Sequence, residues 1–288
     1  MSDKSNFENP DIMKHLFYSL VFVFCASVLV SCKPDHLTIL HTNDTHSQVE
    51  PKDNGQGGYA RRMGLIAEER KADRNLLLVD AGDFSQGTPY FNFYRGRVEI
   101  EAMNYMRYDA GTLGNHEFDN GLDTLAEVLK LAKFPIVCAN YDFTGTPLEG
   151  IVKPYTIVKK GGLKIGIFGL GCQPKGVIAP KNFEPAQFLD PYPVAQAMAD
   201  TLRAQQCDIV VCLSHMGTYG KAARDVCDTA MVAHTRGIDV VIGGHTHKLY
   251  DHLRVANIDG DSIAVCQMGK SGVNLGKIVL SLSDKSEK

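Results

Sequence analysis

Side chains that commonly bind metal ions gather in five short motifs of this 288-residue chain. They offer imidazole, carboxylate and amide groups but no thiolate, a set that suits divalent ions such as Zn, Mn, Fe, Co or Ni. The motifs are Asp44-Thr45-His46, Gly82-Asp83, Gly114-Asn115-His116-Glu117, Ser214-His215 and Gly244-His245-Thr246-His247. Seven candidate ligands are too many for one tetrahedral ion. The pattern therefore predicts two ions that share one bridging carboxylate.

Each motif taken alone has a simpler structural explanation. Asp44 could cap a helix, Asp83 could be a turn residue, and His215 could pack at the edge of a core. Four of the five motifs, however, follow directly after short apolar runs that are typical of buried strands. Ligands of α/β proteins bind outside the carboxyl ends of strands. The motifs are therefore expected to converge, although they lie far apart in the sequence.

The five motifs occur in the order D-x-H, G-D, G-N-H-[DE], H and G-H-x-H, and in this the chain resembles the calcineurin-like metallophosphoesterase superfamily. Longer strings are similar to the catalytic, N-terminal domain of the 5′-nucleotidase family. These strings are ILHTNDTH, GGYARR, AGDFSQGTP, LGNHEFDNG and GIDVVIGGHTH. The resemblance covers residues 37–283. It implies an α/β fold in which two packed mixed β-sheets are flanked by helices, a four-layer αββα sandwich.

The resemblance also implies a role for each candidate residue. The first ion takes Asp44, His46 and His247, the second takes Asn115, His215 and His245, and Asp83 bridges the two. His116 would contact the phosphate, with Asp119 as the acidic partner of a catalytic dyad. Asn115 would both bind metal and help to position the phosphate. Asp80 is expected to be structural, and Arg61 and Arg62 are expected on a solvated helix face.

A dinuclear site of this kind implies a hydrolase. In the family that the chain resembles, a metal-activated hydroxide attacks phosphorus in line with the ester oxygen. The main expectation is 5′-nucleotidase-type hydrolysis of exported nucleotides, for phosphate and nucleoside salvage. A cyclic-nucleotide phosphodiesterase or a sugar-nucleotide hydrolase is an alternative. A second alternative belongs to another class, a non-catalytic, metal-containing lipoprotein that binds ligands without turnover.

The 5′-nucleotidase family usually carries a second, C-terminal domain that binds the nucleotide. This sequence ends at Lys288, shortly after the last expected strand, so we expect that domain to be absent here. Either a separate nucleotide-binding polypeptide docks onto this chain, or the domain acts alone on small phosphoesters. The net charge of −3 argues against a nucleic-acid polymer as partner, because such binders carry a basic excess. A hydrophobic content of 44% excludes disorder for most of the chain.

The N-terminus resembles an export signal. An apolar run over 16–31 follows Lys14 and His15, and it is short for a membrane span. It ends in Leu29-Val30-Ser31-Cys32, which resembles the lipobox of bacterial lipoproteins. We expect a signal peptide over 1–31, with Met13 as the possible true start, and lipid attachment at Cys32. A short tether over 32–36 and the catalytic domain over 37–288 would follow, placing the protein in a bacterial cell envelope.

The pattern of apolar and polar residues along the chain predicts the strands and helices that position the motifs. The expected strands are Leu37–Leu40, Leu76–Val79, Phe134–Ala139, Leu163–Leu170, Asp208–Leu213, Asp239–Ile242, Ser262–Cys266 and Lys277–Leu282. The expected helices are Ala60–Ala72, Val98–Tyr108, Leu122–Leu131, Val194–Gln205 and Lys221–His234. Residues 173–191 have neither periodicity and are expected to form a long loop. The six cysteines after Cys32 are expected to be buried and free, because several stand within apolar runs.

Overall fold

The structure is a computed structural model that describes residues 34–220 and 226–282. The chain divides into two units, Met1–Lys33 and Pro34–Lys288, and all described residues belong to the second. The expected signal peptide and Cys32 lie outside the described residues. Among the described residues, no helix is both long and apolar enough to cross a bilayer.

Two β-sheets form the centre of the second unit. The first sheet has the strand order β12-β1-β2-β3. Its strands are β1 (His36–Thr42), β2 (Leu77–Asp80), β3 (Ala110–Gly111) and β12 (Gly276–Ser281). β1, β2 and β3 are parallel, whereas β12 pairs antiparallel with β1 at the edge. The sheet thus joins the start of the described chain to its end.

The second sheet has the order β10-β11-β9-β8-β6-β5. Its strands are β5 (Tyr155–Lys160), β6 (Leu163–Leu170), β8 (Ile209–Ser214), β9 (Val240–Ile242), β10 (Leu249–Ala256) and β11 (Ser262–Met268). The four inner strands are parallel, and the edge strands β5 and β10 are antiparallel to their neighbours. β4 (Tyr141–Asp142) and β7 (Gln187–Phe188) form a separate two-stranded pair.

Apolar side chains from the two sheets fill the space between them. Alternate residues of β1, Leu37 and Ile39, pack in one cluster with Ile167 of β6 and Val211 of β8. The neighbouring Leu40 belongs to the cluster on the opposite face of its sheet. Because strand side chains alternate between faces, β1 contributes to the core on both of its sides. The strands therefore stay buried on both faces, as their apolar runs predict.

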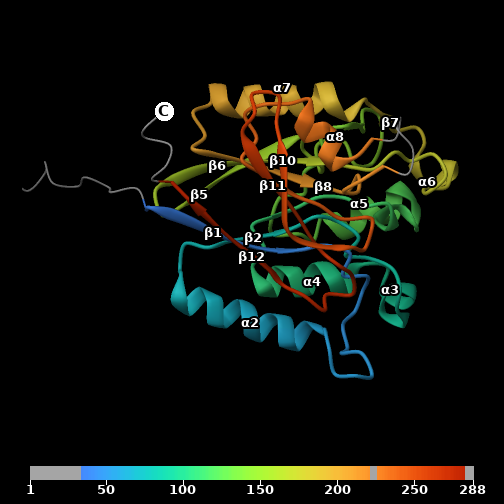
Figure 1. Ribbon diagram of the computed structural model, residues 1–288. Coiled ribbons are helices and arrows are strands. Elements are labelled where there is room, and N and C mark those ends of the chain that lie inside the picture. The colour runs from blue at the N-terminus through green and yellow to red at the C-terminus, as the bar shows by residue number, and fades with distance from the viewer. Residues whose placement is uncertain (1–33, 221–225, 283–288) are drawn as a thin grey trace, which may run out of the picture. The chain divides into compact units, whose positions relative to one another are not determined.

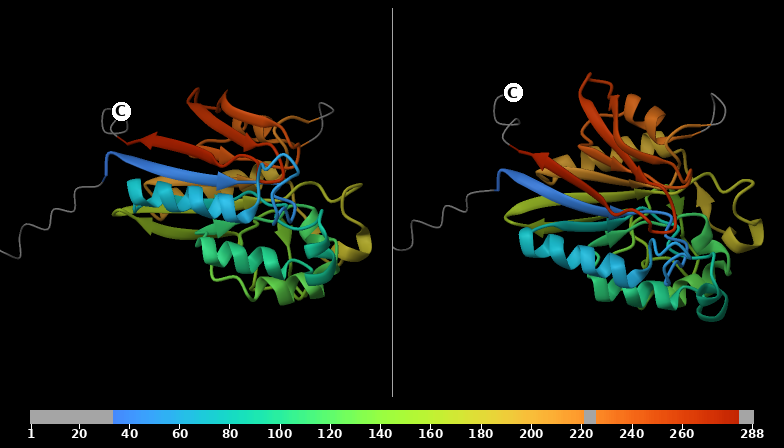
Figure 2. Two further views of the ribbon diagram at one scale, coloured as in Figure 1. Left: turned by 90° about the horizontal axis from the view of Figure 1, so that it is seen from below. Right: turned by 60° about the horizontal axis from the view of Figure 1, so that its bottom comes forward.

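Helices cover the outer face of each sheet (Figure 1). The long helices α2 (Tyr59–Ala72) and α4 (Arg97–Met106) run side by side over the first sheet, as Figure 2 shows. α5 (Gly121–Leu129) contributes to the same cluster, and α7 (Pro191–Ala204) and α8 (Asp228–Ala233) cover the second sheet. Shorter helices are α3 (Pro89–Tyr94), the 3-10 turn η1 (His116–Phe118) and α6 (Pro180–Phe183). The predicted four-layer αββα arrangement is confirmed.

Three expected elements differ from the structure. Phe134–Ala139 is not a regular strand, because its amides bond to several different segments rather than to one partner strand. Val137 donates to Gly111, whereas Cys138 donates to Lys153. The expected loop over 173–191 contains α6 and β7. The expected helix Lys221–His234 is reduced to α8 within the described residues, and 221–225 lie outside them.

Arg62 was expected on a solvated helix face, and this is wrong. Its side chain is buried, with the guanidinium carbon 5.1 Å from the centre of the Tyr59 ring. A Cβ atom at Gly272 would lie only 1.7 Å from Arg62 Nη2, so the segment after β11 packs directly onto this arginine. The six described cysteines are free and buried, as expected.

Candidate active site

The candidate ligands lie in loops at the carboxyl ends of five strands. Asp44 and His46 follow β1, Asp83 follows β2, and Asn115 follows β3. The other three come from the second sheet, His215 directly after β8 and both His245 and His247 after β9. All five are parallel strands of the two packed sheets. The fold therefore brings together residues that are up to 203 positions apart, in the way that strand-end loops predict.

Four of these side chains form one compact group. Single ligand atoms of Asp44, His46, Asp83 and His247 all lie within 4.8 Å of one another. His247 Nε2 is 2.9 Å from His46 Nε2 and 3.3 Å from Asp44 Oδ1. Imidazole nitrogens and carboxylate oxygens that converge in this way suit a divalent ion. The donor set therefore fits the first predicted ion.

The remaining candidates form a second group, which contacts Asp83 through His215. His215 Nε2 is 3.1 Å from Asp83 Oδ2, and His245 Nδ1 is 2.9 Å from Asn115 Oδ1. Asp83 Oδ2 is also 4.0 Å from His46 Nε2. Asp83 thus touches both groups, as a bridging carboxylate must. The assignment of each residue to an ion remains a prediction, and the geometry is compatible with it.

His215 has the hydrogen-bonding pattern of a metal ligand. Its Nδ1 donates to the carbonyl oxygen of Ala81 at 2.7 Å, whereas its buried Nε2 faces Asp83 Oδ2 at 3.1 Å. Ligating histidines usually donate their second ring nitrogen to a carbonyl or carboxylate, which fixes the tautomer. Burial alone would lower the pKa of His215, but the nearby carboxylates of Asp83 and Asp44 raise it to about 10.

Burial sets the protonation of two other histidines. It lowers the pKa of His46 to about 4 and that of His245 to about 4, although both lie near carboxylates. Burial opposes ionisation of Asp83 as well, but His215 outweighs it and holds the pKa of Asp83 below its ordinary value. Neutral imidazoles beside ionised carboxylates are the protonation states that metal binding requires.

The backbone at the candidate ligands is unusual. Five of the seven adopt left-handed φ angles, a conformation that is uncommon outside glycine. They are Asp44 (47°), His46 (46°), Asp83 (53°), His245 (74°) and His247 (57°). Backbone strain of this kind persists only where the surrounding structure enforces it, and it clusters at functional sites.

Glycine allows two of these loops to touch. A Cβ atom at Gly114 would lie 2.1 Å from Asp83 Oδ1, and one at Gly82 would lie 2.5 Å from the Gly114 amide nitrogen. Neither position can hold a larger residue without displacing its neighbour. The motif glycines therefore bring the Asp83 and Asn115 loops into contact.

Glu117 joins the same two loops, a role that the sequence did not predict. Its buried carboxylate accepts hydrogen bonds from the amides of Asp83 (2.9 Å), Ser85 (3.0 Å) and Gly114 (2.6 Å). The fourth position of the G-N-H-[DE] motif was the available signal. Gln267 of β11 was also missed, and it accepts from Thr246 Oγ1 at 2.6 Å and from the Lys248 amide at 2.9 Å. No sequence signal links Gln267 to the His245–His247 loop.

The two residues of the predicted dyad lie within hydrogen-bond distance of each other, and their catalytic role stays a prediction. His116 Nδ1 lies 2.9 Å from Asp119 Oδ2, and both side chains are about one-third exposed, at 31% and 37%. The hydrogen bond to Asp119 raises the pKa of His116, although burial opposes the shift. The His116 ring also makes an edge contact with His46, with 5.4 Å between ring centres. Asp80 is structural as expected, accepting from Thr42 Oγ1 and the Gly82 amide.

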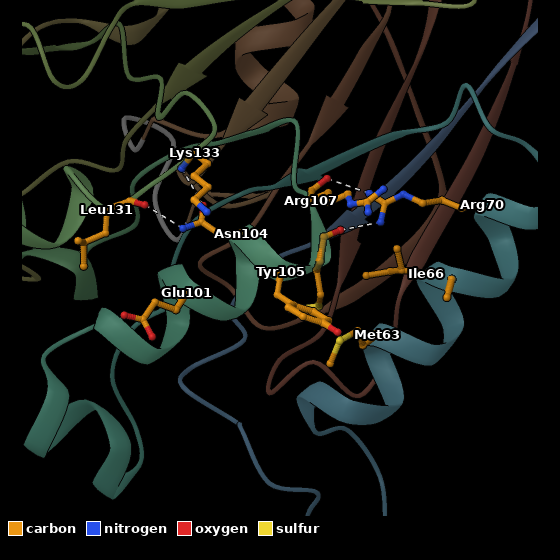
Figure 3. Close-up of a pocket in the computed structure, with 11 residues that line it drawn as sticks. Met63, Ile66, Arg70, Glu101, Asn104, Tyr105, Arg107, Leu131 and Lys133 are labelled. Carbon is orange, nitrogen blue, oxygen red and sulfur yellow. Dashed lines mark hydrogen bonds between the residues drawn. The ribbon is translucent and has the colours of Figure 1, made fainter.

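A large hollow lies away from these residues, between α2 and α4. It measures about 870 Å³ and contains none of the candidate site residues. Figure 3 shows Arg70 of α2 reaching across it to donate to the carbonyl oxygens of Met106 and Arg107. The arginine thereby binds the free carbonyls at the end of α4 and ties the two helices together. The hollow results from the packing of the two helices and is separate from the candidate ligands at the ends of the strands.

Residues 37–249 match the profile of the calcineurin-like phosphoesterases. The chain belongs to this family. Among curated relatives of the family, snake venom 5′-nucleotidase of Crotalus adamanteus is 37% identical over 91% of this chain and 48% of its own length. The 5′-nucleotidase of Homo sapiens is 36% identical over 73% of this chain and 38% of its own length. The chain thus spans about half the length, or less, of these relatives.

Solved structures of the family agree with this fold. The 5′-nucleotidase precursor from Thermus thermophilus superposes with a TM-score of 0.74 and 33% identity, covering 87% of this chain and 55% of that chain. The calcineurin-like phosphoesterase YfkN from Bacillus subtilis superposes with a TM-score of 0.71 and 29% identity, covering 87% and 92%. The family uses two divalent metal ions, and the Asp44, His46, Asp83 and His247 group provides a matching set of donors.

Proposed function

We propose that this chain is the catalytic unit of a dinuclear metal-dependent phosphoesterase that hydrolyses nucleoside 5′-monophosphates. One observation carries the proposal, the convergence of Asp83 with six other His, Asp and Asn side chains, beside the partly exposed His116–Asp119 dyad. The similarity to 5′-nucleotidases supports the choice of substrate. Hydrolysis of exported nucleotides would release phosphate and nucleosides for salvage.

Different side chains of this chain bind the metal ions and position the metal-binding loops. Asp44, His46 and His247 hold one ion, Asn115, His215 and His245 hold the other, and Asp83 joins them. When bound, the two ions polarise the phosphoryl group and supply the nucleophile at neutral pH. The Ala81 carbonyl orients His215. Glu117 holds the Asp83 loop and the Asn115 loop together, because its carboxylate accepts hydrogen bonds from both.

The dyad stabilises charge on the substrate. Asp119 accepts from His116 Nδ1, which leaves Nε2 free to donate to a phosphoryl oxygen. Because the pKa of His116 is raised, its ring carries a proton more readily near neutral pH. A preformed hydrogen-bond donor lowers the free energy of a transition state in which negative charge develops on phosphoryl oxygens. His116 is thus the proposed phosphate contact and Asp119 the residue that orients it.

Two further proposals concern the surroundings of this catalytic unit. A separate nucleotide-binding polypeptide that docks onto this unit would add further contacts to the substrate, and the relatives are about twice as long as the region that they share with this chain. The chain is exported and anchored to the cell envelope through a lipid on Cys32, on the strength of the Leu29-Val30-Ser31-Cys32 string. Metabolic labelling with a fatty-acid analogue tests the anchor, because a Cys32→Ala variant should lose the label.

A substrate panel on the full chain tests the activity. With Mn²⁺ or Zn²⁺ added, we expect release of phosphate from AMP, complete inhibition by a strong chelator, and a loss of at least about 1000-fold in Asp83→Ala, on the scale of a removed essential group. His252→Ala is the matched control, because this histidine is 91% exposed on β10. Full activity in Asp83→Ala would contradict the proposal. Metal-loaded protein that is inert on monoesters and diesters would instead indicate a non-catalytic metal-binding lipoprotein.

A further inference from the structure

Two tyrosines stand beside the candidate active site and contact each other. Tyr219 follows His215 by four residues, and Tyr250 follows His247 by three. Their ring centres lie 5.8 Å apart at an interplanar angle of 73°. Tyr219 is 51% exposed, and Tyr250 is partly exposed. Neither ring belongs to an apolar cluster of the core, so the pair is not explained by packing.

The segments that carry the two tyrosines meet at the metal-ligand candidates. A Cβ atom at Gly217 would lie 2.9 Å from Thr246 Cγ2 and 3.6 Å from His245 Cδ2. The chain that leaves His215 therefore passes over the His245–His247 loop before it reaches Tyr219. This crossing places the tyrosine pair next to the candidate active site, one ring from each loop.

Irregular pairing marks the position of Tyr250. β10 is an edge strand, and its register with β11 shifts between Tyr250 and Leu253. Bulges of this kind occur next to active sites, where they change the direction of a side chain. The neighbouring Leu249 points to the other face of the strand, where it lines a hollow with His41 and Met268. The strand thus leaves regular pairing where the aromatic contact is made.

We propose that Tyr219 and Tyr250 form a binding surface for the nucleobase of the substrate, on this chain itself. The inference rests on the proposed nucleotide hydrolysis, and it adds the side chains that recognise the nucleobase of the nucleotide. Aromatic faces stack on nucleobases of every type, with little dependence on base identity. The edge contact between the rings holds both in place before the base arrives, which lowers the entropy lost on binding. A purine, with its larger face, should bind better than a pyrimidine.

Two substrates that differ only by the base give the first test. The KM of the full chain is measured for AMP and for ribose 5-phosphate, in wild type, Tyr219→Ala and Tyr250→Ala. We expect each alanine variant to raise the KM for AMP relative to that for ribose 5-phosphate by about tenfold, within the range of one lost stacking contact. Tyr219→Phe and Tyr250→Phe, which keep the ring, should restore the wild-type ratio. Tyr105→Ala is the matched control, since Tyr105 is 75% exposed on the distant helix α4.

A binding measurement separates this inference from the proposed function. The affinity of adenosine for the full chain is measured by NMR titration without added metal, and each alanine variant should weaken it by about tenfold. Unchanged adenosine affinity and an unchanged KM ratio would overturn the inference, even if AMP is hydrolysed. Failure of the wild type to hydrolyse either phosphoester would overturn the proposed function instead. In that case weakened adenosine binding in the variants would still support the tyrosine pair as a base-binding surface.

Discussion

Glu117 Oε2 accepts a hydrogen bond of 2.9 Å from the backbone amide of Asp83, 34 residues earlier in the chain. The same carboxylate accepts from Ser85 and Gly114 as well. A buried acidic side chain thereby joins the loop of the bridging candidate to the loop of Asn115. This relationship explains why an acidic residue follows the histidine of the third motif. Because Glu117 is buried, its carboxylate positions backbone loops and does not contact the substrate.

Replacing Glu117 by Gln should loosen this junction. The amide offers one oxygen acceptor and turns an NH₂ group toward backbone donors, which leaves buried N–H groups unpaired at a cost of about 1–3 kcal/mol. We expect a lower thermal midpoint and weaker metal binding in calorimetric titrations. Glu101→Gln on α4 is the control, because that carboxylate is 61% exposed. Equal midpoints and equal metal affinity for both variants would contradict the role given to Glu117.

Replacing Gly114 by Ala should damage the site through contact alone. The added methyl group would lie 2.1 Å from Asp83 Oδ1, so one of the two loops must move. Overpacking of a buried position costs about 1–3 kcal/mol, and displacement of Asp83 should lower metal content. Thermal unfolding and elemental analysis measure the two effects.

Gly64 of α2 provides the contrast for that experiment. Apart from its chain neighbours and the backbone of its own helix, no atom lies within 4 Å of its added Cβ, and its backbone is helical. Gly64→Ala should therefore stabilise the protein by about 0.5–1 kcal/mol, since glycine disfavours helices. If both variants behaved alike, the steric account of Gly114 would be wrong.

Asp119→Asn should reduce turnover while the metal ions stay bound. The variant removes the carboxylate that orients His116 and raises its pKa, yet it leaves every candidate ligand in place. We expect kcat to fall by about 10²-fold, as for other impaired acid–base groups, with wild-type metal content. Phosphate release measures kcat, and elemental analysis of the same sample measures the metal content. Loss of metal together with activity would mean that Asp119 supports the ligands instead.

Asp228 should make the protein less stable as the pH rises. Burial raises the pKa of this carboxyl group from 3.8 to about 7, although hydrogen bonding to Ser214 opposes the shift. The folded state therefore keeps a proton that the unfolded chain releases near pH 4. Stability contributed by that proton is complete below pH 4 and is lost as the pH approaches 7.

Asp228→Asn removes the titration and tests this expectation. The variant should gain about 4 °C in melting temperature relative to wild type between pH 4.5 and pH 8, which corresponds to about 1–2 kcal/mol for a domain of this size. Melting curves across that range provide the measurement. A constant difference between the two proteins at every pH would show that Asp228 does not titrate in this window.

The sequence predicted the central strands and the convergence of the motifs, but not the two edge strands of the second sheet. Leu163–Leu170 forms β6 as expected, because a strand buried on both faces has a nearly continuous apolar run, here interrupted only by Lys164. β5 and β10 were missed because they are edge strands with few buried residues. Such strands lack the apolar run that marks an inner strand.

The same limit applies within the candidate site. Motif order singled out the seven candidate ligands, since each belongs to a short motif that follows an apolar run or contains a glycine. The partners of Glu117 and Gln267 lie on other loops, and only the folded chain brings them together. Arg62 shows the converse, because its burial depends on a glycine that is 210 residues away. Contacts between remote segments leave no local pattern in a single sequence.

The left-handed backbone at five candidate ligands has an evolutionary consequence. Each such residue carries a conformational cost of about 1 kcal/mol or more, which selection tolerates only while the side chain is needed. In a lineage that no longer required catalysis, glycine would be the stabilising substitution at Asp44, His46, Asp83, His245 and His247. Loss of activity and gain of stability would then arise from the same mutations. Retention of all five non-glycine residues is what continued selection for the chemistry would leave behind.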